Sequence, residues 1–292
     1  MMILISGGDG QLGKSIKTAA KLMSYSCTAL SREELDITSK NSVHETMKSL
    51  NPDFVINCAA WTNVDEAESH PEKAFEVNAY GALNLAEASK SVNARFFQIS
   101  TDYVFSGEKI KPWDESDIKS PISVYGLSKS MGEDLVLETY PENSFIIRTA
   151  WLYGLVGHNF LTKVLQKIES NELNLRIVAD QHGQPTSITD LAERIILMLN
   201  LELNSNIFHA TNTGQASWFE FASEIYNLLG QPSSHILPIH STEFISPAKR
   251  PAYSVLGQAA WANSNLTPMR NWQEALAELL DETSDRGRAD ES

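Results

Sequence analysis

The chain has 292 residues, of which 23 are Lys or Arg and 37 are Asp or Glu, so its formal net charge is −14. Hydrophobic residues make up 42% and charged residues 21%, which is the balance of an ordinary globular protein. The acidic excess excludes a protein that tracks nucleic-acid phosphates, because such a protein needs a basic face. An anionic small ligand is still possible, since a local cluster of backbone N–H groups can bind it.

The sequence also argues against a membrane or secreted protein. No apolar run approaches the roughly 20 residues needed to cross a bilayer. The first six residues lack the basic leader and cleavage site of a signal peptide. Cys27 and Cys58 lie in apolar stretches, which favours reduced, buried thiols. We therefore expect a cytoplasmic location.

The first half of the chain alternates short apolar runs with segments of helical periodicity. We interpret the apolar runs at 2–5, 27–30, 54–56, 96–99 and 145–147 as strands. Helical patterns follow at 12–20, 43–50, 74–88 and 123–137. Buried strands separated by helices of about 10–15 residues indicate βαβ units. The predicted fold is therefore α/β, with a Rossmann-type, doubly wound parallel sheet.

The second half predicts helices at 160–170, 188–200, 218–229 and 272–281, with apolar runs at 175–179, 207–210 and 235–239. It carries no glycine-rich phosphate loop. We expect residues 1–150 to form a dinucleotide-binding domain and residues 151–282 mainly a smaller α/β substrate-binding domain, with some segments returning to the first. Residues 283–292 are small or charged, and we expect them to be disordered.

Gly7, Gly10 and Gly13 form a G-x-x-G-x-x-G pattern directly between the first strand and the first helix. Glycines at these positions allow a tight turn, close approach of the backbone to a pyrophosphate and close packing of helix on strand. The helix N-terminus adds N–H groups and a positive dipole end. In this strand–loop–helix context the pattern predicts dinucleotide binding.

The end of the second strand bears on the choice between NAD and NADP. An acidic residue there binds the ribose 2′-hydroxyl, whereas an arginine accommodates a 2′-phosphate. Ser31 and Arg32 follow the strand and suit a phosphate, so we expect NADPH. NADH is the alternative, with Arg32 pointing into solvent. Asp36 lies either at the adenine edge or at the N-cap of the next helix.

Tyr125 and Lys129 form a Y-x-x-x-K pair on one face of a predicted helix. A neighbouring ammonium stabilises a phenolate and lowers the tyrosine pKa from about 10 toward the working pH, so the hydroxyl can protonate a carbonyl oxygen. A surface helix pair is the alternative interpretation. Thr101 and Asp102 follow the fourth strand, where ligands bind in open α/β sheets. The Thr101 hydroxyl would then face the same carbonyl.

These motifs resemble the extended short-chain dehydrogenase/reductase superfamily and, within it, the dTDP-4-dehydrorhamnose reductase family. The resemblance covers residues 2–282 and includes 35–38, 57–65, 77–78, 100–105, 148–154, 180–186 and 250–251. It implies an NADPH-dependent oxidoreductase that reduces the C4 keto group of dTDP-4-dehydro-6-deoxy-L-mannose for polysaccharide biosynthesis. The alternatives are reduction of another 4-keto-deoxysugar nucleotide and a non-catalytic regulatory subunit of the same fold.

The resemblance also implies roles for individual residues. Tyr125 would donate the proton with Lys129 as its partner, Thr101 would polarise the keto group, and Asp102 would help to hold the sugar. The substrate residues implied are Thr101, Asp102, Tyr125, Trp151 and Arg250. The cofactor residues implied are Gly7, Gly10, Gln11, Leu12, Gly13, Ser31, Arg32, Asp36, Ile37, Ala59, Ala60, Trp61, Thr62, Tyr125 and Lys129.

Two departures from related sequences narrow the prediction. Sugar-nucleotide dehydratases of the superfamily carry Asp-Glu after the catalytic Thr, whereas Tyr103 here replaces that Glu and favours simple reduction. Some family members bind magnesium at a dimer interface through a Glu where this chain has Ser15. We therefore expect no metal, and a monomer or weak homodimer rather than a metal-bridged dimer.

Overall fold

The structure is a computed structural model that describes residues 1–172, 174–264 and 266–290. At its centre lies a six-stranded sheet in which every strand pairing is parallel. In spatial order its strands are β10 (Ile207–His209), β5 (Ser144–Thr149), β4 (Arg95–Thr101), β3 (Phe54–Asn57), β1 (Met2–Ser6) and β2 (Ser26–Leu30). The predicted α/β fold with a doubly wound parallel sheet is confirmed.

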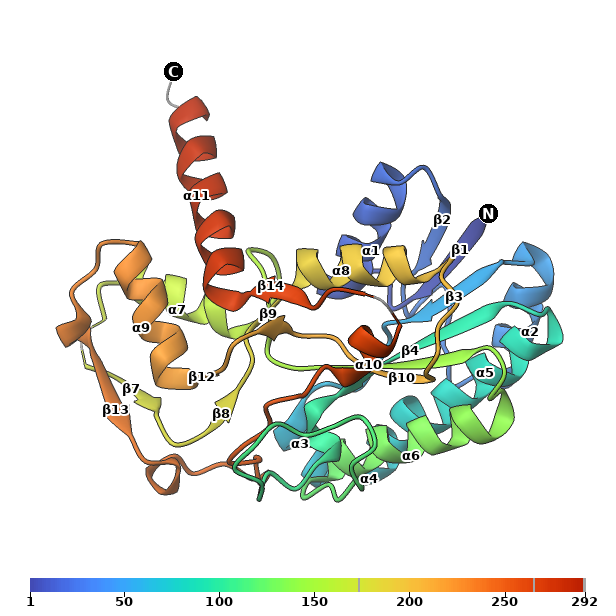
Figure 1. Cartoon of the computed structure of the whole chain (residues 1–292), viewed down its shortest axis with the longest axis horizontal. Helices are drawn as coiled ribbons and strands as arrows, with labels where there is room; N and C mark the ends of the chain where they lie inside the picture. Colours follow the sequence, from blue (N-terminus) through green and yellow to red (C-terminus); the bar gives the residue numbers. More distant parts are fainter. Residues whose placement is uncertain (173, 265, 291–292) are drawn as a thin grey trace.

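Helices cover both faces of this sheet (Figure 1). One face carries α1 (Gln11–Leu22), α8 (Ile188–Met198) and α10 (Ala259–Asn263), and the other carries α2 (Lys40–Leu50), α5 (Ala82–Ser91) and α6 (Val124–Thr139). Side chains alternate along a strand, so Ile3 and Ile5 pack into the first core while Leu4 packs into the second. Two apolar cores therefore hold the sheet between its helices.

The segment predicted as one helix over 74–88 contains a π-helical turn. It comprises α4 (Pro71–Phe75), the π-helix η1 (Glu76–Gly81) and α5, and it follows α3 (Val64–Ser69). π-turns often mark functional positions. This one directs the Asn78 side chain to the backbone of Trp61 and to the Ser128 hydroxyl.

Apart from η2 (Asp102–Val104), which directly follows β4 and packs on α6, the remaining elements form a second lobe and its connections, seen on the left of Figure 1. Its core packs α7 and α9 against Tyr153, Ile236 and Trp272. The lobe and its connections contain β6 (Leu152–Tyr153), α7 (Phe160–Glu169), β7 (Leu175–Val178), β8 (His182–Gly183), β9 (Thr186–Ser187), β11 (Asn212–Thr213), β12 (Ala216–Ser217), α9 (Trp218–Leu228), η3 (Ser233–His235), β13 (Ile236–Ile239), η4 (Ser241–Glu243), β14 (Met269–Asn271) and α11 (Trp272–Asp290).

The chain crosses between the lobes more than once. Strand β10 pairs with β5 at the edge of the central sheet, and α8 packs on α1. Helix α11 projects from the body of the molecule (Figure 1) and continues to Asp290. Disorder of residues 283–292 stays a prediction, and residues 291–292 lie outside the described residues. No described helix is long and apolar enough to span a membrane.

Candidate active site

A cavity of about 840 Å³ opens at the carboxyl ends of β1, β3 and β4. It lies where the strand order reverses around β1, which is the usual ligand position in open α/β sheets. Its lining also includes residues of the second lobe, among them Trp151, His158 and Trp218. Of the residues predicted for the site, all except Ser31 and Arg250 line this cavity.

The glycine loop forms one wall through its backbone. Gly7 has a φ of +71°, and a Cβ there would lie 2.6 Å from the backbone nitrogen of Ala59. A Cβ on Gly13 would lie 2.4 Å from the carbonyl oxygen of Gly7. Gly10 is the N-cap of α1 and has no side chain that could occupy the N–H groups of the first turn. The loop therefore forms a close-fitting cradle with a helix N-terminus directed at the cavity.

The end of β2 presents Arg32 and Asp36 to the cavity. Ser31 instead forms a local turn, in which its backbone N–H donates to the Glu34 carboxylate and its hydroxyl accepts from the Glu34 N–H. Asp36 is not a helix cap, because Ser39 caps α2. One Asp36 oxygen accepts from the N–H and the hydroxyl of Thr38.

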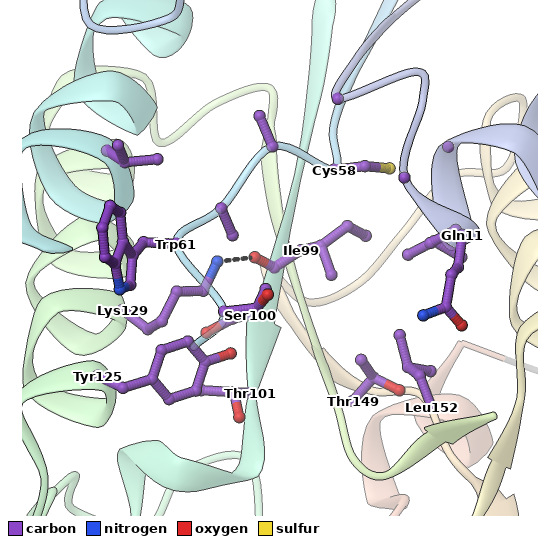
Figure 2. Close-up of a pocket in the computed structure, with 18 of the residues that line it drawn as sticks. Gln11, Cys58, Trp61, Ile99, Ser100, Thr101, Tyr125, Lys129, Thr149 and Leu152 are labelled. Carbon is purple, nitrogen blue, oxygen red and sulfur yellow. Dashed lines mark hydrogen bonds between the residues drawn. The ribbon is translucent and has the colours of Figure 1, made fainter. Parts of the chain in front are cut away.

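Gln11 ties the glycine loop to the second lobe. Its Nε2 donates to the carbonyl oxygen of His158 at 3.0 Å, and its Oε1 accepts from Asn159 Nδ2 at 3.0 Å. Gly157, with a φ of +88°, packs so closely that a Cβ would lie 2.4 Å from Gln11 Cγ. Figure 2 shows Gln11 on the side of the cavity opposite Tyr125. One residue thus links the glycine loop to the other lobe.

Tyr125, Lys129 and Thr101 lie side by side on the other side of the cavity (Figure 2). Ser123 caps α6 and sets its start, which places Tyr125 and Lys129 one turn apart on the face toward β4. The Lys129 ammonium donates to the carbonyl oxygen of Ile99 at 2.6 Å. The Tyr125 ring meets the Tyr103 ring edge-on, with ring centroids 5.7 Å apart.

The protonation of this pair differs from the sequence expectation. Burial raises the pKa of Tyr125 to about 12, opposed by a hydrogen bond with Thr101. Burial lowers the pKa of Lys129 to about 8, opposed by the negative charge of Glu133. The expected lowering of the Tyr125 pKa by Lys129 is wrong for this state of the protein, because burial dominates and the ammonium is bonded to Ile99.

Asp102 is buried beside Thr101. The Thr101 hydroxyl donates to Asp102 Oδ1 at 3.0 Å, and burial raises the pKa of this carboxyl to about 6. A carboxyl with a pKa near neutrality is poised to exchange protons in a cavity. Thr101 therefore has a hydrogen-bond partner of its own before it meets any ligand.

The second lobe contributes an aromatic wall that the sequence analysis predicted only in part. Trp151 stacks on Trp218, with ring centroids 3.5 Å apart and planes 6° apart. Trp151 has a φ of +45°, and Gly183 lies against its ring, where a Cβ would be 2.5 Å from it. Trp218, the first residue of α9, is a cavity residue that the motif analysis missed.

Arg250 points to a partner within the protein. Its guanidinium holds Asp65 with both nitrogens, at 2.8 Å and 3.1 Å, and this pairing lowers the pKa of Asp65. Ser246 and Ala248 also bond to Asp65, so the segment before Arg250 is tied to α3. Contact of Arg250 with a diphosphate stays a prediction. Across the described residues, no group of three or more His, Cys, Asp or Glu side chains is placed to hold a metal.

Known proteins resemble the chain over almost its whole length. The family model described as the RmlD substrate binding domain matches residues 1–284. The dTDP-4-dehydrorhamnose reductase of Streptomyces griseus is 42% identical over 94% of this chain and 91% of the relative. The chain belongs to the dTDP-4-dehydrorhamnose reductase family. Its members are oxidoreductases, so this chain is an enzyme of that class.

The names of similar proteins mention a cofactor and more than one substrate. The structure of the dTDP-4-dehydrorhamnose reductase of Bacillus anthracis in complex with NADP is 36% identical, with a TM-score of 0.92, covering 96% of this chain and 99% of that one. A Streptomyces niveus relative named dTDP-4-keto-6-deoxy-D-glucose reductase is 38% identical over 95% of this chain and 96% of its own length. The family therefore includes reductases named for different keto sugars.

Proposed function

We propose that this enzyme reduces the C4 keto group of dTDP-4-dehydrorhamnose with NADPH, giving dTDP-L-rhamnose for polysaccharide biosynthesis. The observation that carries the proposal is the meeting of Tyr125, Lys129 and Thr101 in a cavity bounded by a glycine cradle and by the stacked Trp151 and Trp218. This arrangement provides an anion-binding loop, a proton donor and an aromatic surface in one space. The names of the relatives supply the substrate.

The residues present fit a dinucleotide. The cradle at Gly7 and Gly13 leaves no room for a Cβ, and the α1 N-terminus suits a pyrophosphate. Arg32, at the edge of the cavity, suits a 2′-phosphate. Trp61, fixed by Asn78 through two backbone hydrogen bonds, lines the cavity between the glycine loop and α6. When bound, NADPH supplies the hydride.

Tyr125 donates the proton. Its raised pKa, about 12, keeps the hydroxyl protonated at neutral pH. An alkoxide formed at C4 is a stronger base than a phenolate, so proton transfer from Tyr125 to the new oxygen is favourable. Lys129 then stabilises the phenolate by its charge, because an opposite charge close to a phenolate favours the ionised form.

Thr101 orients the keto oxygen next to Tyr125. Its hydroxyl can donate a single hydrogen bond, and in the free protein it donates that bond to Asp102. To donate to the substrate, the hydroxyl must rotate away from Asp102. Asp102 then remains beside the sugar as an acceptor for its hydroxyl groups. We propose that Trp151 and Trp218 cover the apolar face of the sugar or base.

The test is to mix the purified enzyme, NADPH and dTDP-4-dehydrorhamnose and to follow loss of the reduced nicotinamide absorbance and formation of dTDP-L-rhamnose. The Tyr125→Phe variant should lose about 10²–10⁴-fold in kcat, because it lacks the general acid, and should still bind NADPH. Tyr140→Phe is the matched control, since Tyr140 is buried in the core directly after the C-terminal end of α6. A Tyr125→Phe enzyme as active as the parent would overturn the mechanism.

The second candidate is reduction of a related keto sugar such as dTDP-4-keto-6-deoxy-D-glucose, which the name of the Streptomyces niveus relative favours. Comparing kcat/KM for the two keto sugars decides between them. A regulatory subunit without turnover would reduce neither. We also propose a cytoplasmic location, which the two free cysteines support. We propose a monomer or weak homodimer, which light scattering of the purified protein would test.

A further inference from the structure

A buried polar row lies at the carboxyl ends of three neighbouring strands, and it begins at Ser100 in the cavity lining. Ser100 of β4 is in register with Arg148 of β5, and Arg148 is in register with His209 of β10. All three side chains are buried. Helix α6 faces this row with Glu133, which lies two turns after Tyr125 and one turn after Lys129.

Glu133 is the centre of the row. Its Oε1 accepts from the Ser100 hydroxyl at 2.5 Å and from Arg148 Nε at 2.9 Å, and its Oε2 accepts from Arg148 Nη2 at 2.8 Å. Lys119 lies 3.3 Å from Oε2. The Glu133 and Arg148 side chains are each only 1% exposed. Burying an ion pair this deeply costs desolvation energy that apolar residues of equal size would avoid. This cost suggests that the Glu133–Arg148 pair has a role other than packing.

His209 completes the row without adding charge. Its Nδ1 lies 2.8 Å from the carbonyl oxygen of Gly257, which can only accept, so Nδ1 carries the proton. Its Nε2 then accepts from Arg148 Nη1 at 3.3 Å. Burial and the Arg148 charge lower the pKa of His209 to about 3, so the ring is neutral at physiological pH. Glu133 is therefore the carboxylate that binds the Ser100 and Arg148 side chains of this row, while the Glu115 carboxylate meets the backbone of His209.

The row connects to the reacting groups through one peptide unit. Lys129 donates to the carbonyl oxygen of Ile99, and Glu133 accepts from the hydroxyl of the next residue, Ser100. Two residues one helical turn apart on α6 thus form hydrogen bonds with consecutive residues of β4. Thr101 follows directly, so this double attachment sets its position relative to Tyr125.

We propose that Glu133 is a positioning residue of the reduction, which fixes the end of β4 against α6 and holds Lys129 in its ammonium form. The proposal rests on the proposed function only for its kinetic readout. Without Glu133, Arg148 would lose the carboxylate that it binds, and Lys129 would lose the negative charge that opposes the effect of its burial. Lys129 is the one of the two that can lose its proton, because a guanidinium stays charged.

Several elements contribute titratable or charged groups around Lys129. The Glu133 charge raises the Lys129 pKa against burial, and the Cys58 thiol acts in the same direction more weakly. The groups to be considered in a titration are Cys58 after β3, Asp102 after β4, Tyr125 and Glu133 on α6, Arg148 on β5, and the neutral His209 on β10. Among the charged groups that act on Lys129, Glu133 changes its pKa the most, so removal of Glu133 should have the largest effect on that pKa.

The experiment titrates Lys129 directly by the NMR shift of its labelled side-chain carbon, assigned with Lys129→Arg, and in parallel measures the pH profile of kcat/KM. In Glu133→Gln, the Lys129 midpoint should fall by about one pH unit or more, and the alkaline limb of the profile should move with it. The expected loss is about tenfold in kcat/KM on the alkaline side, with less loss at acidic pH, where Lys129 stays protonated. The matched control is Asp134→Asn, the neighbouring exposed carboxylate that also bonds to Lys119.

Glu133→Gln leaves Arg148 buried and without its carboxylate partner, which can destabilise the fold. A second variant therefore separates the effect of the Glu133 charge from a folding defect. Glu133→Gln combined with Arg148→Met removes both charges, and with a native melting profile it should show a fall in the Lys129 midpoint in the same direction, made smaller by the loss of the Arg148 charge. An unchanged midpoint in both variants overturns the proposal. If the parent protein reduces no keto sugar, the proposed function fails, and the NMR titration still decides whether Glu133 controls Lys129.

Discussion

Two walls of the cavity, one formed by the glycine loop and one by Trp151 and Trp218, differ in which atoms form them. The glycine-loop wall is backbone: Gly7 packs against the backbone of Ala59, and Gly10 and Gly13 pack against the carbonyl oxygen of Gly7. The wall from the second lobe is side chain: the rings of Trp151 and Trp218 come from distant segments and are held by each other and by Gly183. A backbone wall tolerates almost no added atom, whereas a side-chain wall can lose a ring and keep its shape in part. The two walls should therefore respond differently to substitution.

The largest effect is expected where the backbone wall is closed. Gly7→Ala places a Cβ 2.6 Å from Ala59 at a φ of +71°, so the loop must shift. We expect the free energy of unfolding to fall by about 1–3 kcal/mol and NADPH affinity to fall by about 30–100-fold, measured by denaturation and by NADPH fluorescence. Gly230→Ala is the control, because Gly230 has a φ of +64° but nothing within 4 Å. NADPH binding that survives Gly7→Ala unchanged would refute the cradle.

A smaller effect is expected at the edge of the same wall. Arg32 lines the cavity by its side chain, so Arg32→Ala should weaken NADPH binding by about tenfold, as expected for loss of one charge-assisted contact. NADH binding should stay within about twofold, since NADH has no 2′-phosphate. Arg176→Ala, at an exposed arginine paired with Glu243, is the control. Equal losses for both cofactors would contradict the assignment.

The side-chain wall should give a graded response. Trp218→Ala removes the ring that stacks on Trp151, and an aromatic pair contributes about 0.5–1.5 kcal/mol beyond its burial. We expect KM for the sugar nucleotide to rise by about 2–10-fold while NADPH affinity stays the same, as measured by steady-state kinetics and fluorescence. Trp218→Phe should recover most of the loss. A matching loss of NADPH affinity would show that the two walls are not independent.

The smallest effect concerns the ion pair that ties the second lobe to α3. Asp65→Asn removes the half-exposed Arg250 pair, and such pairs contribute about 0.2–1 kcal/mol. Because the Asp65 pKa is lowered in the folded state, this stability is present above the unfolded pKa of about 3.9 and is lost as the pH falls through the lower folded value. Denaturation at neutral and at strongly acidic pH measures it. A difference that persists in acid would contradict this origin.

The contrast between the walls also explains what could be predicted from the sequence. The strands and the glycine loop depend on neighbours in the chain, so apolar runs and the spacing of Gly7, Gly10 and Gly13 indicate them directly. The spacing of Tyr125 and Lys129 indicates their shared helix face for the same reason. These features follow from local geometry, and the sheet they predict is the one observed.

Features set by tertiary contact could not be predicted in this way. The π-turn around Asn78 depends on its bonds to Trp61 and Ser128, and no local pattern shows those partners. Trp218 reaches the cavity only because α9 packs beside Trp151. The pKa of Tyr125 depends on burial, which the spacing of residues does not reveal. The links between Glu133, Ser100 and Arg148 likewise join three separate elements.

The place of β10 has a consequence for synthesis on the ribosome. One edge strand of the sheet, β10, and the helix α8, which covers one face of the sheet, come from residues that are translated after residues 1–150. Until they emerge, β5 is a bare edge and the face beneath α8 is uncovered, which is the condition that promotes strand-to-strand aggregation. A fragment that ends at residue 150 would carry the complete phosphate loop and still lack the parts that keep it soluble.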